Sequence, residues 1–326
     1  MPKKILIIRF NSIGDIVLTS PVIRNLAIEG YELHYLCKKA YRSLLEPNPY
    51  LSQLWLFEGD YKILIKQLKA ERFDYVLDLH NNLRSYRIKS QLSCRTYTLT
   101  KSRWRNFLLT RFDWARKQRE HIVYRFLDVA SPLLTVNVNA MPEFYFPKGK
   151  SYGHISLPSK YSVIVVSTAF YTKNIPVNKL IHFLELSSET WILIGGPDDL
   201  QRADQIMQGV KQNNCRSMVG KLSLDESAYV MKESSLVLSG DTGMMHIAAA
   251  LAVPVVAVFG STHPILGYTP FSQNTESNYA IVENKNIACR PCTRQGRHSC
   301  PKKHFRCMND ISVEEIKHQV ELLLKS

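Results

Sequence analysis

Residues 235–262 read SLVLSGDTGMMHIAAALAVPVVAVFGST, and their pattern indicates a compact βαβ unit. Residues 236–239 form a short apolar run, 240–243 a turn, 244–251 a helix rich in small residues, and 253–259 a second apolar run. Both runs carry polar residues only at their ends, so we expect parallel strands that are buried on two faces. The turn then lies at the carboxyl edge of the sheet, where open α/β sheets bind ligands.

The turn itself is a candidate phosphate site. Asp241 or Thr242 can cap the helix, and the amides of Gly243 and Met244 would then point outward at the positive end of the helix dipole. A phosphate fits such a position. The alternative is a tight turn with an ordinary N-cap. His246, in the first helical turn, is either a ligand-facing donor or a packing residue.

Two motifs carry a resemblance to a known family. Residues 241–251 read DTGMMHIAAAL and precede Pro254 and the sequence VFGST, while residues 5–21 read ILIIRFNSIGDIVLTSP. Together they resemble the two signatures of the lipopolysaccharide heptosyltransferases, glycosyltransferase family 9. The resemblance implies an α/β protein of the GT-B architecture, in which two Rossmann-like domains with parallel sheets face an interdomain cleft.

Length and composition agree with two domains. The chain has 326 residues, of which 45% are hydrophobic, enough for two cores. The apolar run near the N-terminus is too short for a signal peptide, and no uninterrupted apolar stretch of 18 residues occurs. We therefore expect a cytoplasmic protein. Its seven cysteines are then expected to be thiols or metal ligands rather than disulfides.

Positive charge is concentrated in the first half of the chain. Residues 1–150 hold 25 Lys and Arg against 13 Asp and Glu, whereas residues 151–326 hold 17 against 15. Within residues 84–125, twelve basic side chains are interleaved with aromatic ones. Such a segment can lie at a membrane surface, hold a phosphorylated glycolipid or bind nucleic acid. It can also be merely solvated.

The order of apolar runs predicts a parallel sheet in each half. The expected strands are 5–10, 33–36, 53–57, 75–79, 161–167 and 191–194, and the expected helices are 16–29, 41–45, 61–69, 176–186 and 312–324, with a mostly helical stretch at 104–134. Ser223 and Glu226 form a capping box before a further helix. The final helix often crosses back to the N-terminal domain in GT-B proteins. No G-x-G-x-x-G or P-loop motif is present, which disfavours dinucleotide oxidoreductases and P-loop NTPases.

Proline and glycine residues interrupt every periodicity between residues 137 and 158, so the linker is placed there. The resulting domains are 1–150, which the resemblance implies binds the acceptor, and 151–326, which it implies binds the nucleotide sugar.

The loop at residues 167–176 should open at the same sheet edge as the Asp241 turn. It contains Thr168 and Lys173, and Lys173 is a second candidate ligand for a diphosphate. In the family pattern this lysine precedes a Trp-Pro pair, whereas Ile175 stands here in place of the tryptophan. A surface lysine without function is the alternative. Asp198 and Asp199 are interpreted as helix-start acids rather than as ribose ligands.

A nucleotide-sugar donor would require stabilisation of the leaving diphosphate, which Lys173 and the amides near Gly243 and Met244 can supply without a metal ion or cofactor. No Asp-x-Asp pair follows a predicted strand. The family's catalytic aspartate maps onto Asp15, which would act as general base in an inverting reaction. The alternative is that Asp15 is the N-cap of a helix that begins at Ile16.

Four cysteines near the C-terminus form a C-x2-C-x7-C-x6-C pattern: Cys289, Cys292, Cys300 and Cys307. A leading C-x2-C is consistent with tetrahedral zinc, but the later spacing departs from a paired site, and reduced, metal-free cysteines are the favoured interpretation.

The resemblance thus implies transfer of a heptose from ADP-heptose to a lipopolysaccharide core precursor, an anionic glycolipid, at the inner face of the cytoplasmic membrane. Three basic residues, Arg103, Arg105 and Arg111, are the candidate acceptor ligands. The alternatives are a related enzyme that uses another nucleotide sugar, an epimerase, or a non-catalytic binder of nucleotide sugars or nucleic acid. Nucleic acid is not the expected partner.

Overall fold

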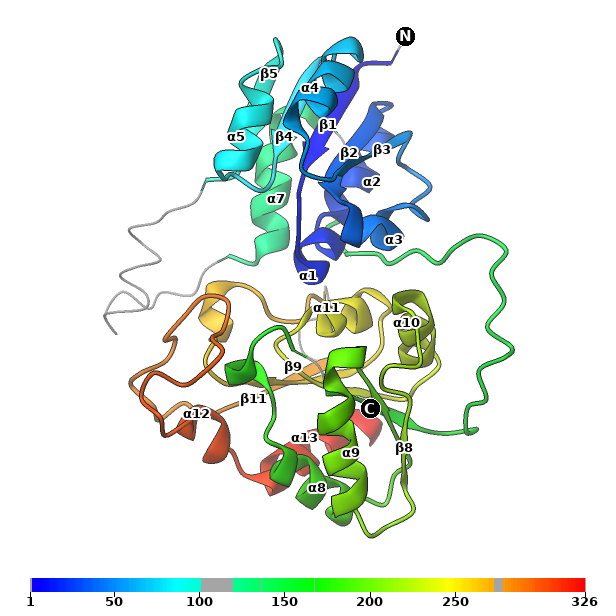
Figure 1. Ribbon diagram of the computed structural model, residues 1–326, viewed down its shortest axis with the longest axis vertical. Coiled ribbons are helices and arrows are strands. Elements are labelled where there is room, and N and C mark those ends of the chain that lie inside the picture. The colour runs from blue at the N-terminus through cyan, green and yellow to red at the C-terminus, as the bar shows by residue number, and fades with distance from the viewer. Residues whose placement is uncertain (1, 101–119, 136, 167, 273–277, 326) are drawn as a thin grey trace. The chain divides into compact units, whose positions relative to one another are not determined.

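The computed structural model describes residues 2–100, 120–135, 137–166, 168–272 and 278–325. The described chain forms two compact units, and the chain passes from the first to the second between Lys150 and Ser151. Each unit contains one sheet with helices packed on it (Figure 1).

The first unit is built on a five-stranded sheet in which every neighbouring pair is parallel. Its strands are β1 (Lys4–Ile8), β2 (Glu32–Lys38), β3 (Gln53–Phe57), β4 (Tyr75–Asp78) and β5 (Arg95–Thr98), in the order β3-β2-β1-β4-β5. The chain moves outward from β1 in one direction and then returns to place β4 on the other side of β1. The boundary between β1 and β4 is therefore a topological switch point, the place where such sheets bind ligands.

Helices cover both faces of the first sheet (Figure 1). They are α1 (Ile13–Val17), α2 (Ser20–Ile28), α3 (Arg42–Leu45), α4 (Tyr61–Ala70), α5 (Leu83–Lys89) and α7 (Ile122–Ala130). Leu64, Leu68 and Ile88, from α4 and α5, join the same buried cluster as Leu6 and Ile8 of β1. On the other face, α2 packs against α7.

The single helix that the sequence predicted over residues 16–29 is wrong, because two helices occur. Helix α1 ends at Val17 and α2 begins at Ser20, with Pro21 in its first turn. The hydroxyl of Thr19 donates to the carbonyl of Ile16 at 2.7 Å, and Ser20 does the same to Val17. These side chains occupy carbonyls at the end of α1, and Pro21 is well placed at the start of α2.

The second unit repeats the plan with a six-stranded parallel sheet. Its strands are β6 (Ser162–Val165), β7 (Trp191–Ile194), β8 (Cys215–Ser217), β9 (Val237–Gly240), β10 (Val255–Phe259) and β11 (Tyr279–Glu283), in the order β11-β10-β9-β6-β7-β8. The switch point lies between β6 and β9. The βαβ unit predicted over residues 235–262 is confirmed as β9, a helix and β10, and both strands are fully buried.

Six helices are described in the second unit: α8 (Val177–Leu186), α9 (Leu200–Gly209), α10 (Leu224–Lys232), α11 (Gly243–Ala250), α12 (Arg306–Asn309) and α13 (Val313–Lys325). The capping box at Ser223 and Glu226 is confirmed. The carboxylate of Asp199 accepts the Gly196 amide, so this acid acts at a helix start as interpreted. Helix α13 makes its extensive contacts with α8, β10 and β11 of its own unit.

Among the described residues, no helix combines the length and the apolar character that crossing a bilayer requires.

Candidate functional site

Asp15 lies beyond the carboxyl end of β1, at the switch point of the first sheet. One carboxylate oxygen, Oδ2, accepts a hydrogen bond from the Ser12 hydroxyl at 2.6 Å and forms an ion pair with the Arg9 guanidinium. The other oxygen, Oδ1, is buried and has no hydrogen-bond partner among the described residues. One oxygen is thus held in place while the other remains able to accept a proton.

The interpretation of Asp15 as a helix N-cap is wrong. Helix α1 begins at Ile13, three residues earlier than expected, and Ser12 occupies the N-cap position without a capping side-chain bond. Asp15 lies inside the first turn, where an acidic group still interacts favourably with the helix dipole. Its role as general base remains a prediction.

Arg9 was not identified from the sequence, although it connects the groups around Asp15. Its Nε donates to the carbonyl of Asn11 at 2.9 Å, and its Nη1 donates to the carbonyl of Leu79, beyond β4, at 2.8 Å. Its guanidinium carbon also lies 5.7 Å from the ring centroid of Phe126. The signal in the sequence was an arginine within the expected first strand and in the same motif as Asp15, and it becomes interpretable once β1 and β4 are known to be neighbours.

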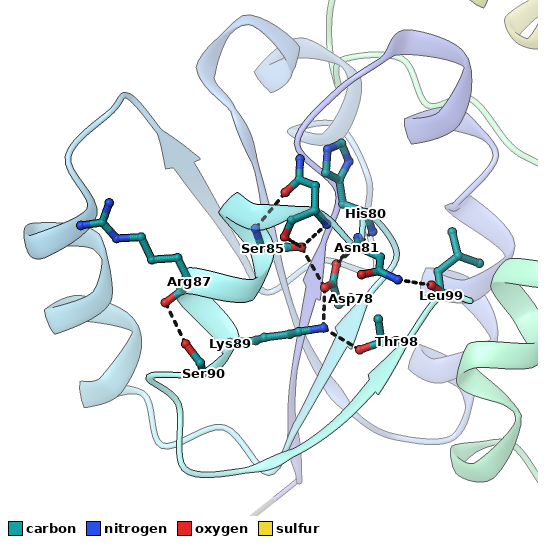
Figure 2. Close-up of polar contacts among 10 residues, drawn as sticks. Asp78, His80, Asn81, Ser85, Arg87, Lys89, Ser90, Thr98 and Leu99 are labelled. Atoms are coloured by element: carbon teal, nitrogen blue, oxygen red, sulfur yellow. Dashed lines mark hydrogen bonds and ion pairs between the residues drawn. The ribbon is translucent and has the colours of Figure 1, made fainter. Parts of the chain in front are cut away.

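Asp78 organises the adjacent strand end, as Figure 2 shows. It is fully buried at the end of β4, and one of its oxygens accepts hydrogen bonds from the backbone amides of His80 at 3.1 Å and Asn81 at 2.7 Å. Its other oxygen accepts the Ser85 hydroxyl and pairs with the Lys89 ammonium, each at 2.8 Å. A buried carboxylate with four donors is well satisfied, so this network fixes the loop after β4 and the start of α5.

In the second unit, the structure brings two predicted site residues together. The Lys173 ammonium lies 3.0 Å from a carboxylate oxygen of Asp241, and both side chains are largely buried. Lys173 follows β6 and Asp241 follows β9, so the pair lies at the switch point of the second sheet. Thr168, in the same loop as Lys173, donates its hydroxyl to the Asn174 side chain at 2.6 Å and thereby braces the loop.

Close backbone packing holds the Lys173 loop against the strand ends. A Cβ on Gly240 would lie 2.5 Å from the carbonyl oxygen of Lys173, and one on Gly296 would lie 2.9 Å from the Lys173 side chain. Gly296 also has a φ of +100°, which other residues rarely adopt. The Thr172 hydroxyl accepts hydrogen bonds from the Ser261 hydroxyl and from the Arg297 backbone amide, both at 2.8 Å. The lysine therefore projects from a fixed loop.

Helix α11 begins at Gly243, directly after Asp241 and Thr242, so its first amides lie near this pair. Thr242 is the N-cap residue, but its side chain makes no capping hydrogen bond, so the expected side-chain cap is absent. Thr242, Gly243 and Met244 remain partly exposed, whereas His246 is buried. Uncapped amides at a helix start are unsatisfied donors, and together with the dipole they attract an anion.

The zinc alternative for the four C-terminal cysteines stays a prediction. Across the part of the chain that the structure describes, no group of three or more His, Cys, Asp or Glu side chains could hold a metal ion. Burial raises the pKa of the Cys292 thiol, and it raises that of Cys307 to about 12, which favours the protonated thiols.

Arg290, which lies between Cys289 and Cys292, makes buried polar contacts that hold this segment in place. It is buried, pairs with Glu283 at 3.0 Å, and donates to the carbonyls of Phe259 at 3.0 Å and Thr262 at 2.9 Å. The cysteine segment is thus attached to the loop after β10 by an arginine.

The candidate acceptor ligands Arg103, Arg105 and Arg111 lie outside the described residues.

Comparison with known proteins identifies the family. The family model for glycosyltransferase family 9 (heptosyltransferase) matches residues 62–319. Lipooligosaccharide heptosyltransferase 2 of Campylobacter jejuni is 23% identical over 332 residues, covering 96% of each protein. The structure of E. coli ADP-heptose lps heptosyltransferase II superposes with a TM-score of 0.73 at 18% identity, covering 99% of this chain and 98% of that one.

A third similar structure is that of the iron-containing dodecameric glycosyltransferase TibC from enterotoxigenic E. coli. It has a TM-score of 0.60 at 14% identity and covers 99% of this chain and 76% of that one.

These findings confirm the predicted fold class, the GT-B arrangement of two Rossmann-like α/β units with parallel sheets, and they define the protein as a glycosyltransferase. Because the family model matches most of its length, the chain belongs to glycosyltransferase family 9, the heptosyltransferases.

Proposed function

We propose that this glycosyltransferase moves a heptose from ADP-heptose to a lipopolysaccharide core precursor with inversion at the anomeric carbon. Family membership supports heptose transfer, and the similar E. coli enzyme is named for ADP-heptose. The observation that carries the proposal is the Lys173–Asp241 pair beside the uncapped start of α11. It provides a cation and unsatisfied amides where a diphosphate would bind.

Departure of the nucleoside diphosphate places negative charge on its phosphate oxygens. The Lys173 ammonium and the amides of Gly243 and Met244 stabilise that charge because they are positioned before the reaction begins. Asp241 holds the ammonium at 3.0 Å, so little rearrangement is needed. In this proposal the second unit, residues 151–326, binds the nucleotide sugar.

The same groups make the reaction independent of a bound metal ion in our proposal. Activity should therefore survive dialysis against EDTA and should not rise when magnesium, manganese or iron is added back. Iron is tested separately, because the similar glycosyltransferase TibC is described as iron-containing. A loss of turnover that one of these ions restores would contradict metal independence.

The attacking hydroxyl of the acceptor must lose its proton as the glycosidic bond forms. Asp15 is the proposed general base, because Arg9 and Ser12 hold one carboxylate oxygen, while the other has no hydrogen-bond partner in the described part of the chain. The proton would pass to that free oxygen. Attack on the face opposite the departing diphosphate inverts the anomeric configuration.

The first unit, residues 1–150, is proposed to bind the acceptor and to work at the cytoplasmic face of the inner membrane. Its excess of basic residues supports an anionic partner. Arg103, Arg105 and Arg111 remain the proposed acceptor ligands, and neutralising them should raise the acceptor KM while donor affinity stays nearly constant. Equal effects on both substrates would contradict this assignment.

A direct test incubates the purified protein with a core precursor that lacks heptose and with a panel of nucleotide sugars. Mass spectrometry should detect one added heptose with ADP-heptose, and NMR of the product should show inverted anomeric configuration. Transfer of a different sugar, or epimerisation of the nucleotide sugar without transfer, would overturn the proposal.

A further inference from the structure

Helices α4 and α5 expose apolar side chains on the first unit. The exposed fraction is 87% for Leu83, 64% for Tyr86 and 60% for Ile63. Leu83 and Tyr86 are three residues apart and therefore share a helix face. The Arg87 guanidinium lies over the Tyr61 ring at 4.3 Å, which joins α5 to the first turn of α4, where Ile63 lies. Large apolar side chains exposed together mark an interaction surface.

The charged side chains of this surface are all basic. Five basic side chains are exposed on the two helices, Lys62, Lys66, Lys69, Arg84 and Arg87, and neither helix contains an acidic residue. The flanking acids already have partners: Glu58 pairs with Lys39 at 2.9 Å, Glu71 pairs with Lys4 at 2.8 Å, and Asp60 caps α4. We call the outer side of these two helices the α4–α5 face.

Helix α5 is held rigidly in the orientation that exposes these residues. Seven residues are too few for a stable isolated helix. Ser85 and Lys89 attach its inner side to the buried carboxylate of Asp78, and Asn82 caps its start. In Figure 2, Arg87 points away from the Asp78 network. Leu83 and Tyr86 therefore stay outside unless this network breaks.

We propose that the α4–α5 face binds the surface of an anionic phospholipid bilayer. Leu83, Tyr86 and Ile63 enter the boundary between headgroups and acyl chains, and the lysines and arginines bind the headgroups. The exposed aliphatic side chains Leu83 and Ile63 favour a bilayer over a nucleic acid, whose bases stack on aromatic rings. The charge of the face requires an anionic surface.

This inference rests on the proposed function, because the proposed acceptor is a glycolipid and a glycolipid is embedded in a membrane. The position of the face agrees with that role. Helix α5 begins directly after the loop that follows β4, and β4 pairs with β1, whose own carboxyl end leads to Asp15. The bilayer-binding helix thus starts at the same sheet edge as the proposed base.

The experiment measures co-sedimentation of the full chain with vesicles of phosphatidylcholine, with and without phosphatidylglycerol. We expect binding only when phosphatidylglycerol is present, and weakening by added salt. The double variant Leu83→Ser/Tyr86→Ser should bind at least about tenfold more weakly. Arg84→Gln/Arg87→Gln should lose about fivefold for each charge removed.

Ile28→Ser is the matched control, because Ile28 is also 60% exposed but lies on α2, which packs with α7 on the other face of the sheet. It should bind like the unmodified protein. Circular dichroism checks that each variant is folded. Absence of binding to phosphatidylglycerol vesicles, preference for RNA, or an equal loss in Ile28→Ser would overturn the proposal.

A second readout separates this inference from the proposed function. Leu83→Ser/Tyr86→Ser should lose turnover of acceptor embedded in vesicles, yet it should stay within about twofold of normal on a soluble, delipidated acceptor. Equal losses on both acceptors would contradict bilayer docking. Vesicle binding by a protein that transfers no sugar would instead refute the proposed function alone.

Discussion

Replacing Asp15 with asparagine tests the proposed base most directly. The amide keeps the shape of the side chain and an oxygen that can accept from Ser12 and Arg9, but it cannot take up a proton at neutral pH. Positioned general bases typically contribute 10² to 10⁴ in rate. We therefore expect kcat to fall by about 10² or more, which corresponds to roughly 2.7 kcal/mol in the activation barrier.

The structure also predicts a limited loss of stability in Asp15→Asn. The Arg9 guanidinium is buried, and it would face a neutral amide instead of a carboxylate. Because hydrogen-bond geometry can persist, the cost should be about 1 to 2 kcal/mol. That change lowers the melting temperature by only a few degrees. Nucleotide-sugar affinity should stay nearly constant, since the proposed donor ligands lie in the second unit.

The assay compares kcat, melting temperature and ADP affinity for Asp15→Asn and for the control Ser12→Ala. The control removes one hydrogen bond from the same carboxylate oxygen but leaves the carboxylate itself. Its kcat should stay within about tenfold of normal. A near-normal kcat in Asp15→Asn, or equal falls in both variants, would refute the assignment of Asp15 as base.

Three further predictions concern the second unit. Lys173→Met should weaken ADP binding by about tenfold or more, because it removes the cation and leaves the buried Asp241 carboxylate unpaired; calorimetry that shows unchanged affinity would contradict this. Gly240→Ala should displace the Lys173 loop, because its new Cβ would lie 2.5 Å from a backbone carbonyl. We expect about 1 to 3 kcal/mol of destabilisation with weaker ADP binding, and normal values for both would argue against a fixed loop. Burial raises the pKa of Cys215 to about 12, so at pH 8 only about one thiol in 10⁴ is the reactive thiolate. Its alkylation in the folded protein should be slow and should accelerate as pH rises, and rapid labelling at pH 8 would disprove such burial.

The sequence by itself determined most of the strands and the motifs at their ends. Strands buried on both faces of a parallel sheet must be continuously apolar, so they are readable as local runs. The strand at Gln53–Phe57 was predicted with its observed bounds, and β9 and β10 within two residues of theirs. A helix held by polar contacts on its inner side was missed. Helix α5 has Ser85 and Lys89 on its inner side, so it lacks the apolar periodicity that reveals a helix.

Only the tertiary structure decided which side chains are in direct contact. Lys173 and Asp241 are far apart in the chain, and they meet because β6 pairs with β9 as well as with β7, the next strand in sequence. Arg9 reaches the carbonyl of Leu79 for the same reason, since β1 pairs with β4. Strand order depends on packing across the whole sheet, so no local pattern of residues encodes these contacts.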